Sequence, residues 1–396
     1  MPGRPRRISI AERRARLARR HHLAPAFRAT SPVDVARDLV ALHSSDPKTV
    51  FLSLWARLRA PDVAAIERAL YEGRTLLRLL GMRRTLFVVP VELAPLLQDG
   101  FAAAIARTER RRLTKFLEGA GVAGDVPRWL RQAEAAALRA VIEGGEVSGA
   151  EVTKADPRLA TKIVLAQGKR YEATVSVSTR ALILLAMQGK IVRGRPLGSW
   201  ISSQYRWSAT DHWIPGGLPR MSPEEAQAEM IRRWLGAFGP GTLTDLRWWT
   251  GLTAREVHRA LSAIRPVEVE LEDGGAGFVL RDDVGAVRGP QPWVALLPGL
   301  DPTVMGWAER GWYLGDHGKA LFDTSGNAGP TVWLNGRVVG LWSRRSTGEV
   351  VFRLLEDVGA EAVRMVEAEA ARLQGWLGDV SIVPRFRTPL ERELSG

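Results

Sequence analysis

The sequence predicts an α+β protein in which tandem helical segments, each closed by a β-hairpin, are followed by a C-terminal β-rich region. Two observations predict this fold. Three stretches share one layout, with a capped helix start, further helical patterns and two short apolar runs about a turn, and after residue 289 apolar and polar residues alternate. Helices followed by a hairpin are the order of a winged helix-turn-helix module. We therefore expect three tandem winged helices and a β-rich region.

The predicted organisation has five parts. They are a basic N-terminal arm at 1–28, a first winged helix with a basic helical extension at 29–125, a second at 126–215, a third at 216–288, and a β-rich region with a final helix at 289–396. A chain of 396 residues with 45% hydrophobic residues can bury several cores.

The first module opens at Ser31, whose hydroxyl can cap a helix with proline at its first position. The helix should run to about Leu42. The remaining pattern predicts helices over 51–58 and 61–72, and strands over 76–80 and 84–89 about a turn at Gly81.

The second module repeats this order. A possible capping box joins Ser148 and Glu151, and a helix is predicted over 178–188. Its wing is expected at 190–193 and 200–202.

The third module gives the clearest local signal. After a helix capped by Ser222, a helix over 243–250, a turn at Gly251 and a helix capped by Thr253 predict a helix-turn-helix. Strands at 267–271 and 277–280 would form its wing.

Two further regions complete the prediction. Residues 90–119 should be helical and carry clustered basic side chains. In the C-terminal region, Asn335-Gly336 between apolar runs predicts a hairpin, and a last helix is expected over 360–377.

Composition favours nucleic acid as the partner. The net charge of +13 makes a polyanion attractive, because neutralising each phosphate releases condensed counterions. The alternative is that an arginine-rich coding bias inflates the charge. The chain has no cysteine, which excludes disulfides and thiolate metal sites and fits a reducing cytoplasm. It has no apolar run long enough for a bilayer and no apolar core of a signal peptide, so we expect no membrane partner.

No metal or cofactor is expected. His21 and His22 are adjacent near an end of the chain expected to be mobile, and the other histidines lack companion ligands at zinc-like spacing. There is no Walker loop and no dinucleotide fingerprint after a strand.

The stretch His43 to Asp46, between two apolar patterns, is the candidate catalytic corner. A carboxylate, an imidazole and hydroxyls together can carry out acid–base chemistry and align water. The alternative is a turn, since Ser-Ser-Asp-Pro is also a common way to leave a helix.

Four motifs give the chain a resemblance to the AlkZ/YcaQ-like DNA glycosylases. They are LHSSDPKTVFLSLWARL, GMRRTLFVVP, LLPGLDPTVMGWAERGW and NGRVVGLW, in that order between about residues 30 and 360. The resemblance implies cofactor-independent hydrolysis of the N-glycosidic bond of alkylated, N7-modified purines in double-stranded DNA, or unhooking of crosslinks.

The resemblance also suggests site residues. The family's Gln positions, which orient the attacking water, fall on His43 and Ser45, and Asp46 would be the carboxylate. Where the family commonly has a histidine, this chain has Phe87. Asp301 matches a motif position, but Asp-Pro is also a turn, and a structural role is favoured.

Seven arginines are candidate phosphate contacts, each with the alternative of an ordinary solvated surface residue: Arg83, Arg84, Arg107, Arg110, Arg111, Arg255 and Arg259. The rival to a glycosylase is a non-catalytic DNA-binding protein, regulator or architectural. Tandem modules on one chain remove the need for a dimer, so a monomer is expected.

Overall fold

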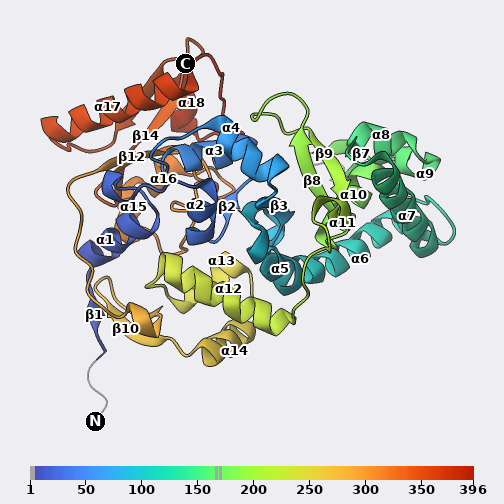
Figure 1. Ribbon diagram of the computed structural model, residues 1–396, viewed down its shortest axis with the longest axis horizontal. Helices are drawn as coiled ribbons and strands as arrows, with labels where there is room; N and C mark the ends of the chain where they lie inside the picture. The colour runs from blue at the N-terminus through green and yellow to red at the C-terminus, as the bar shows by residue number, and fades with distance from the viewer. Residues whose placement is uncertain (1–4, 166–167, 169–171) are drawn as a thin grey trace. The chain divides into compact units, whose positions relative to one another are not determined.

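The computed structural model describes residues 5–165, 168 and 172–396 and has a mixed α+β fold (Figure 1). The predicted α+β class is confirmed. The chain divides into two compact units, the first made of Met1–Ile66 with Gln227–Gly396 and the second of Glu67–Ala226.

The first unit is formed by the two ends of the chain, and among the described residues eleven α-helices lie wholly or mostly in it. They are α1 (Ile10–Arg20), α2 (Pro32–Asp38), α3 (Pro47–Trp55), α4 (Val63–Glu67), α12 (Pro223–Phe238), α13 (Leu243–Thr250), α14 (Ala254–Ile264), α15 (Gly311–Leu314), α16 (Gly318–Leu321), α17 (Ala360–Leu377) and α18 (Pro389–Ser395). The first residues of α12 and the last of α4 belong to the second unit.

Its strands form two sheets besides the short strand β2 (Leu42–His43). The larger is antiparallel in the order β12 (Val294–Leu297), β13 (Thr331–Leu334), β14 (Arg337–Arg344) and β15 (Val350–Leu354). In the smaller, β1 (Arg7–Ile8) runs parallel to β10 (Val267–Leu271), which pairs with β11 (Ala276–Val279).

The sheet β12–β15 forms part of the first unit's core. Asn335 and Gly336 have φ angles of 49° and 85°, the left-handed values that a two-residue hairpin turn requires, so the predicted hairpin is confirmed. The predicted last helix is α17, which packs against β12 and β15. Buried rings fill the core, including Trp293, Trp307 and Trp333.

The second unit contains α5 (Ala94–Leu97), α6 (Ala103–Gly119), α7 (Val126–Gly144), α8 (Gly149–Lys154), α9 (Pro157–Ala160), α10 (Val177–Met187) and α11 (Thr210–Trp213). Its strands are β3 (Leu76–Leu80), β4 (Leu86–Pro90), β5 (Val147–Ser148), β6 (Lys162–Leu165), β7 (Ala173–Ser176), β8 (Ile191–Pro196) and β9 (Tyr205–Ala209). Helices α6, α7 and α10 pack together over one apolar core.

Local helix signals are confirmed. Ser148 and Glu151 form a reciprocal capping box at α8, and Thr253 and Glu256 form one at α14. Gly251, which ends α13, has the left-handed conformation that the predicted turn needs.

Three element boundaries were predicted wrongly. The helix expected over 51–58 is α3, which begins at Pro47 and ends at Trp55, because Asp46 caps it. The first helix ends at Asp38 instead of Leu42, because Val40 turns the chain with a φ angle of 64° and β2 follows. The second wing strand of the middle module is β9, not 200–202: the chain turns at Gly198, with a φ angle of 87°, and Pro196 pairs with Tyr205.

The expectation of a mobile end at His21 and His22 is also wrong. Residues 10–20 form α1, whose Arg13 and Arg16 are buried and form ion pairs with Asp273 and Glu12. His21 has no exposed surface. Residues 1–4 of the expected basic arm lie outside the described residues.

Candidate active site

The corner His43 to Asp46 joins β2 to α3 in the first unit, and it brings its three candidate side chains onto one short turn. Asp46 is the N-cap of α3: its side chain accepts a hydrogen bond from the Lys48 backbone N–H, and Pro47 occupies the first helical position. Asp46 is only 4% exposed, while His43 and Ser45 are half-buried. The sequence folds this way because an Asp before proline both stops an extended segment and caps the next helix.

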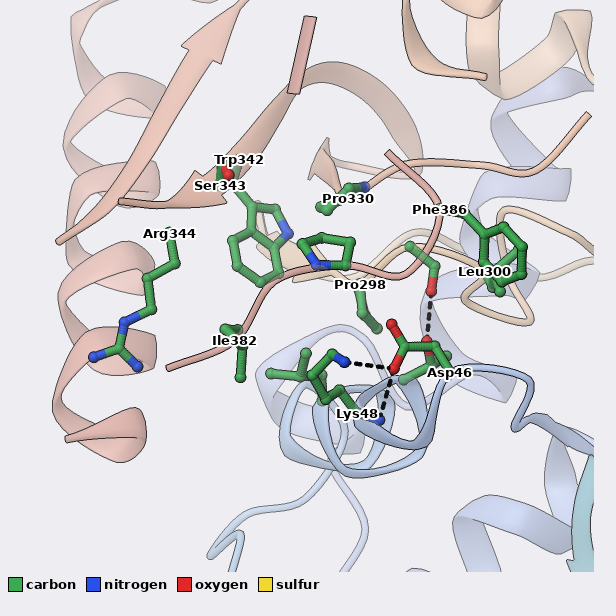
Figure 2. Close-up of a pocket in the computed structure, with 14 residues that line it drawn as sticks. Asp46, Lys48, Pro298, Leu300, Pro330, Trp342, Ser343, Arg344, Ile382 and Phe386 are labelled. Atoms are coloured by element: carbon green, nitrogen blue, oxygen red, sulfur yellow. Dashed lines mark hydrogen bonds and ion pairs between the residues drawn. The ribbon is translucent and has the colours of Figure 1, made fainter. Parts of the chain in front are cut away.

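Both oxygens of the Asp46 carboxylate have partners. Oδ1 accepts from the Lys48 backbone N–H at 3.2 Å and lies 2.9 Å from Lys48 Nζ, as Figure 2 shows. Oδ2 accepts from the Arg385 backbone N–H at 2.8 Å. A buried carboxylate with these donors stays in one orientation.

The imidazole of His43 is oriented by its own turn. The Ser45 backbone N–H donates to His43 Nδ1 at 3.4 Å. In a neutral imidazole, one nitrogen accepts and the other carries the hydrogen. This contact therefore favours the tautomer with the hydrogen on Nε2.

A segment from the end of the chain reaches the corner. Arg385 Nη1 donates to the Ser45 carbonyl at 3.2 Å, in addition to the backbone contact with Asp46. The segment 378–387, called the strap below, is held at its start by Arg344, which donates to the carbonyls of Gly378 and Val380.

The strap also closes a pocket beside the corner. The pocket lies between the first turns of α3, the loop that follows β12, the end of β14 and the strap (Figure 2). Its walls are mainly apolar, and its polar residues include Asp46 and Lys48; the strap contributes Ile382, Pro384 and Phe386. His43 and Ser45 do not line it.

Asp301 has the structural position that the sequence favoured. Its carboxylate forms a two-point ion pair with Arg57, at 2.8 Å and 2.7 Å, and both side chains have no exposed surface. Ser53 donates to the same carboxylate at 2.7 Å. The pair fixes α3 to the loop after β12.

The candidate phosphate contacts of the second unit lie on two elements. Arg83 and Arg84 are exposed in the turn between β3 and β4, and both have positive φ angles. On α6, Arg107 and Arg111 are exposed, whereas Arg110 forms an ion pair with the buried Glu134. Burial raises the pKa of the Glu134 carboxyl, and Arg110 opposes that rise.

The candidate contacts of the first unit lie on α14. Arg255 and Arg259 are both exposed, and Arg259 Nη2 donates to Gln227 Oε1 at 2.8 Å. Their neighbours Trp248 and Trp249, on α13, are half-buried; Trp249 packs its ring against Trp234. Of the predicted site residues, His43, Ser45 and Asp46 thus lie on one turn, and the candidate arginines lie on three other elements.

Sequence reasoning missed two residues of the corner. Lys48 follows the cap by two positions, so its contact with Asp46 could have been predicted from that spacing. Arg385 lies 339 residues further along the chain, and no local signal connects it with Asp46. Among the described residues, no helix is long and apolar enough to cross a membrane, and no cluster of three acidic or histidine side chains could hold a metal ion.

Comparison with known proteins identifies the family. The family model described as DNA glycosylase AlkZ-like matches residues 36–376. The chain therefore belongs to the AlkZ-like DNA glycosylase family, and the resemblance of its motifs is confirmed.

Two relatives extend this comparison. A curated protein described as an interstrand DNA cross-link repair glycosylase, from Streptomyces sahachiroi, is 28% identical over 166 residues, which are 40% of this chain and 44% of that protein. The match thus spans less than half the length of the curated relative. The structure of Streptomyces sahachiroi DNA glycosylase AlkZ has a TM-score of 0.73 with this one at 22% identity, over 93% of this chain and 97% of that one. The two share a fold.

Proposed function

We propose that the protein is a monofunctional DNA glycosylase, which hydrolyses the N-glycosidic bond of N7-alkylated purines with water as the nucleophile. The observation that carries the proposal is the corner itself. A fixed carboxylate, an oriented imidazole and a serine lie on one turn, inside the stretch that matches the family model.

The proposed chemistry needs few groups. An N7-alkylated purine is cationic and leaves readily, so no acid is required at the base. Loss of the base gives an oxocarbenium-like sugar, which a fixed negative charge stabilises. Asp46 supplies that charge, His43 positions the water, and Ser45 orients the imidazole through its backbone N–H.

Double-stranded DNA is the proposed partner, bound by one copy of the chain. The proposed winged helices cover residues 29–125, 126–215 and 216–288. Phosphate contacts are proposed for Arg83, Arg84, Arg107 and Arg111 in the second unit and for Arg255 and Arg259 in the first. Arg110 has the Glu134 carboxylate as its partner, so it contributes less to DNA binding.

Crosslinked DNA is a second proposed substrate. The curated Streptomyces relative is described as acting in interstrand cross-link repair, and this chain shares part of its sequence. A duplex that carries a bulky N7 adduct therefore belongs in the test beside a methylated duplex.

One observation favours the rival, a DNA-binding protein without catalysis. Both oxygens of Asp46 already have partners, and Lys48 opposes its charge, as in a purely structural helix cap. The two functions differ in what they predict for the release of a damaged base.

The test is release of N7-methylguanine from methylated duplex DNA, and of the adducted base from a bulky-adduct duplex. Wild type is compared with Asp46→Asn, His43→Ala and Ser45→Ala. We expect release by wild type and a loss of about 100-fold or more in Asp46→Asn or His43→Ala.

The matched control is Asp34→Asn, an exposed acid in α2 that forms an ion pair with Arg37 on the same helix. It should release base at the wild-type rate. If the protein binds both duplexes and releases base from neither, the non-catalytic reading replaces the proposal.

A further inference from the structure

A pocket in the second unit has the chemistry of a nucleotide site. It lies between α6 and α10, beside the turn between β3 and β4 and the end of β6, and encloses about 640 Å³ of empty space, part of it open to solvent. The part of this space that the centre of a water molecule can occupy is about 230 Å³. Its charged residues are Arg84, Glu109, Arg112 and Arg180.

The acid in this pocket does not balance the arginines. Glu109 is shared by Arg84, at 3.4 Å, and Arg112, at 2.9 Å. Three guanidinium groups and one carboxylate leave a net charge of +2 among the lining side chains. A phosphate group is an anion that several guanidinium forks bind well.

Arg180 is the residue that points to a ligand. It is half-buried in α10 and has no hydrogen bond or ion pair with any described residue. Burial, and then the nearby charge of Arg84, lower the pKa of its guanidinium, while Glu109 opposes the shift. A partly desolvated arginine beside a like charge is costly unless an anion joins it.

The apolar wall of the pocket contains an aromatic ring. Phe116 is 36% exposed and is the one aromatic among the large hydrophobic side chains that are exposed in the described part of the chain. Leu113 and Leu184 lie beside it in the lining. An exposed ring next to phosphate-binding groups is the arrangement that binds a base by stacking.

We propose that this pocket binds one nucleotide of a DNA strand, with the phosphate held by its three arginines and the base stacked on Phe116. The proposal rests on the proposed function in one respect, that DNA is the ligand. Arg112, Arg180 and Phe116 are then binding residues beyond the seven arginines that the sequence suggested.

The experiment measures binding of the full-length protein to undamaged DNA, with fluorescein-labelled single-stranded dT12 and a 12-base-pair duplex as probes, over a series of salt concentrations. Arg180→Ala should weaken binding of dT12 about five- to tenfold and reduce the slope of log K against log salt by about 0.7, the loss of one phosphate contact in a single strand. The control Arg131→Ala removes an exposed arginine of α7 in the same unit and should change affinity less than about twofold.

Phe116→Ala tests the base. It should weaken dT12 binding about fivefold or more, because stacking on an aromatic ring contributes at least that much per base, and should change duplex binding much less, since paired bases are already stacked. Ile142→Ala, which truncates an exposed apolar side chain of α7, is its control. Thermal melting of each variant verifies the fold.

If Arg180→Ala behaves as Arg131→Ala does, the phosphate site is refuted. If Phe116→Ala behaves as Ile142→Ala does, the base is not bound there and the nucleotide proposal fails. Because these probes carry no damage, the result is independent of base release: a protein that binds dT12 through this pocket but releases no base would contradict the proposed function and leave the pocket intact.

Discussion

At the scale of single residues, Arg57, two positions after the end of α3, forms a buried ion pair with Asp301. Neither side chain has exposed surface. We expect Asp301→Ala to lower the free energy of unfolding by about 3–5 kcal/mol, because it leaves an arginine buried without its counter-charge. Urea denaturation measures this. Asp34→Ala, which breaks an exposed ion pair with Arg37, should cost about 1 kcal/mol or less; equal losses in the two variants would contradict the prediction.

His21 predicts a pH dependence of stability. Burial, and then the charge of Arg57, hold the pKa of its imidazole well below its ordinary value of 6.5. The unfolded chain takes up a proton near that pH and the folded protein does not. The free energy of unfolding is therefore highest above about pH 6.5 and falls as the pH is lowered, by up to about 1.4 kcal/mol per pH unit from this residue.

The measurement is urea denaturation between about pH 7.5 and pH 5. His21→Gln should flatten the slope below pH 6.5 relative to wild type, whatever its stability at neutral pH. His258→Gln, at an exposed position of α14, should leave the slope unchanged. Parallel curves for wild type and His21→Gln would exclude His21 as the source.

Single residues also show what the sequence could predict. The cap at Asp46 is a local pattern, because the carboxylate, the proline and the first helical amides are neighbours in the chain. The second oxygen of Asp46 is held by Arg385, which lies 339 residues further along the chain. The buried Arg57 is paired with Asp301, which lies 244 residues away. A pattern along the chain contains no information on such contacts. The sequence therefore indicated a turn at 43–46, but it did not predict the distant residues that hold this turn in place.

At the scale of elements, helices that begin at a local capping pattern were predicted. A helix whose burial depends on residues far along the chain was not. The capping boxes of α8 and α14 follow from residues three apart. Helix α1 reads as a basic arm, and partners far along the chain explain why Arg13 can be buried there. They are Asp273, 260 residues away, and Trp312, whose ring centroid lies 4.2 Å from the guanidinium carbon. Tertiary partners convert a charged stretch into part of a core.

The strap is an element whose contribution can be tested. It lies beyond residue 376, where the match to the family model ends, yet its Arg385 N–H donates to Asp46. Arg385→Pro removes that donor. We expect it to lower the free energy of unfolding by about 1.5–3 kcal/mol, the value of a hydrogen bond to a charged group, and to reduce the rate of base release.

Two variants separate the donor from general damage to the strap. Arg385→Ala keeps the backbone N–H and should lose less stability than Arg385→Pro. Val383→Pro places a proline in the same segment at an exposed position, where the backbone N–H donates to no described residue. If Val383→Pro and Arg385→Pro are equally impaired in urea denaturation and in base release, the contact with Asp46 is not what the strap contributes.

At the scale of the whole molecule, the net charge of +13 indicates a polyanion, but ion pairs decide which arginines can meet it. On α6, Arg107 has no ion pair with a described residue, and Arg110, three positions on, has the buried Glu134 as its partner. Net charge therefore predicts the class of partner and overestimates the number of phosphates that the protein neutralises.

The two arginines predict opposite phenotypes. Arg107→Ala should weaken binding to a duplex and reduce the slope of log K against log salt by about 0.9, the loss of one phosphate contact, with little change in stability. Arg110→Ala should leave the slope nearly unchanged and lower the free energy of unfolding, because Glu134, whose pKa burial already raises, loses the charge that opposes the rise. For the two variants, fluorescence anisotropy over a salt series measures the salt dependence of binding, and urea denaturation measures the free energy of unfolding. Each variant is the control for the other, since both remove one positive charge from the same helix. The prediction is contradicted if Arg110→Ala reduces the salt slope or if Arg107→Ala lowers the free energy of unfolding. In that case the ion pair with Glu134 does not determine which arginines of α6 stabilise the fold and which bind DNA.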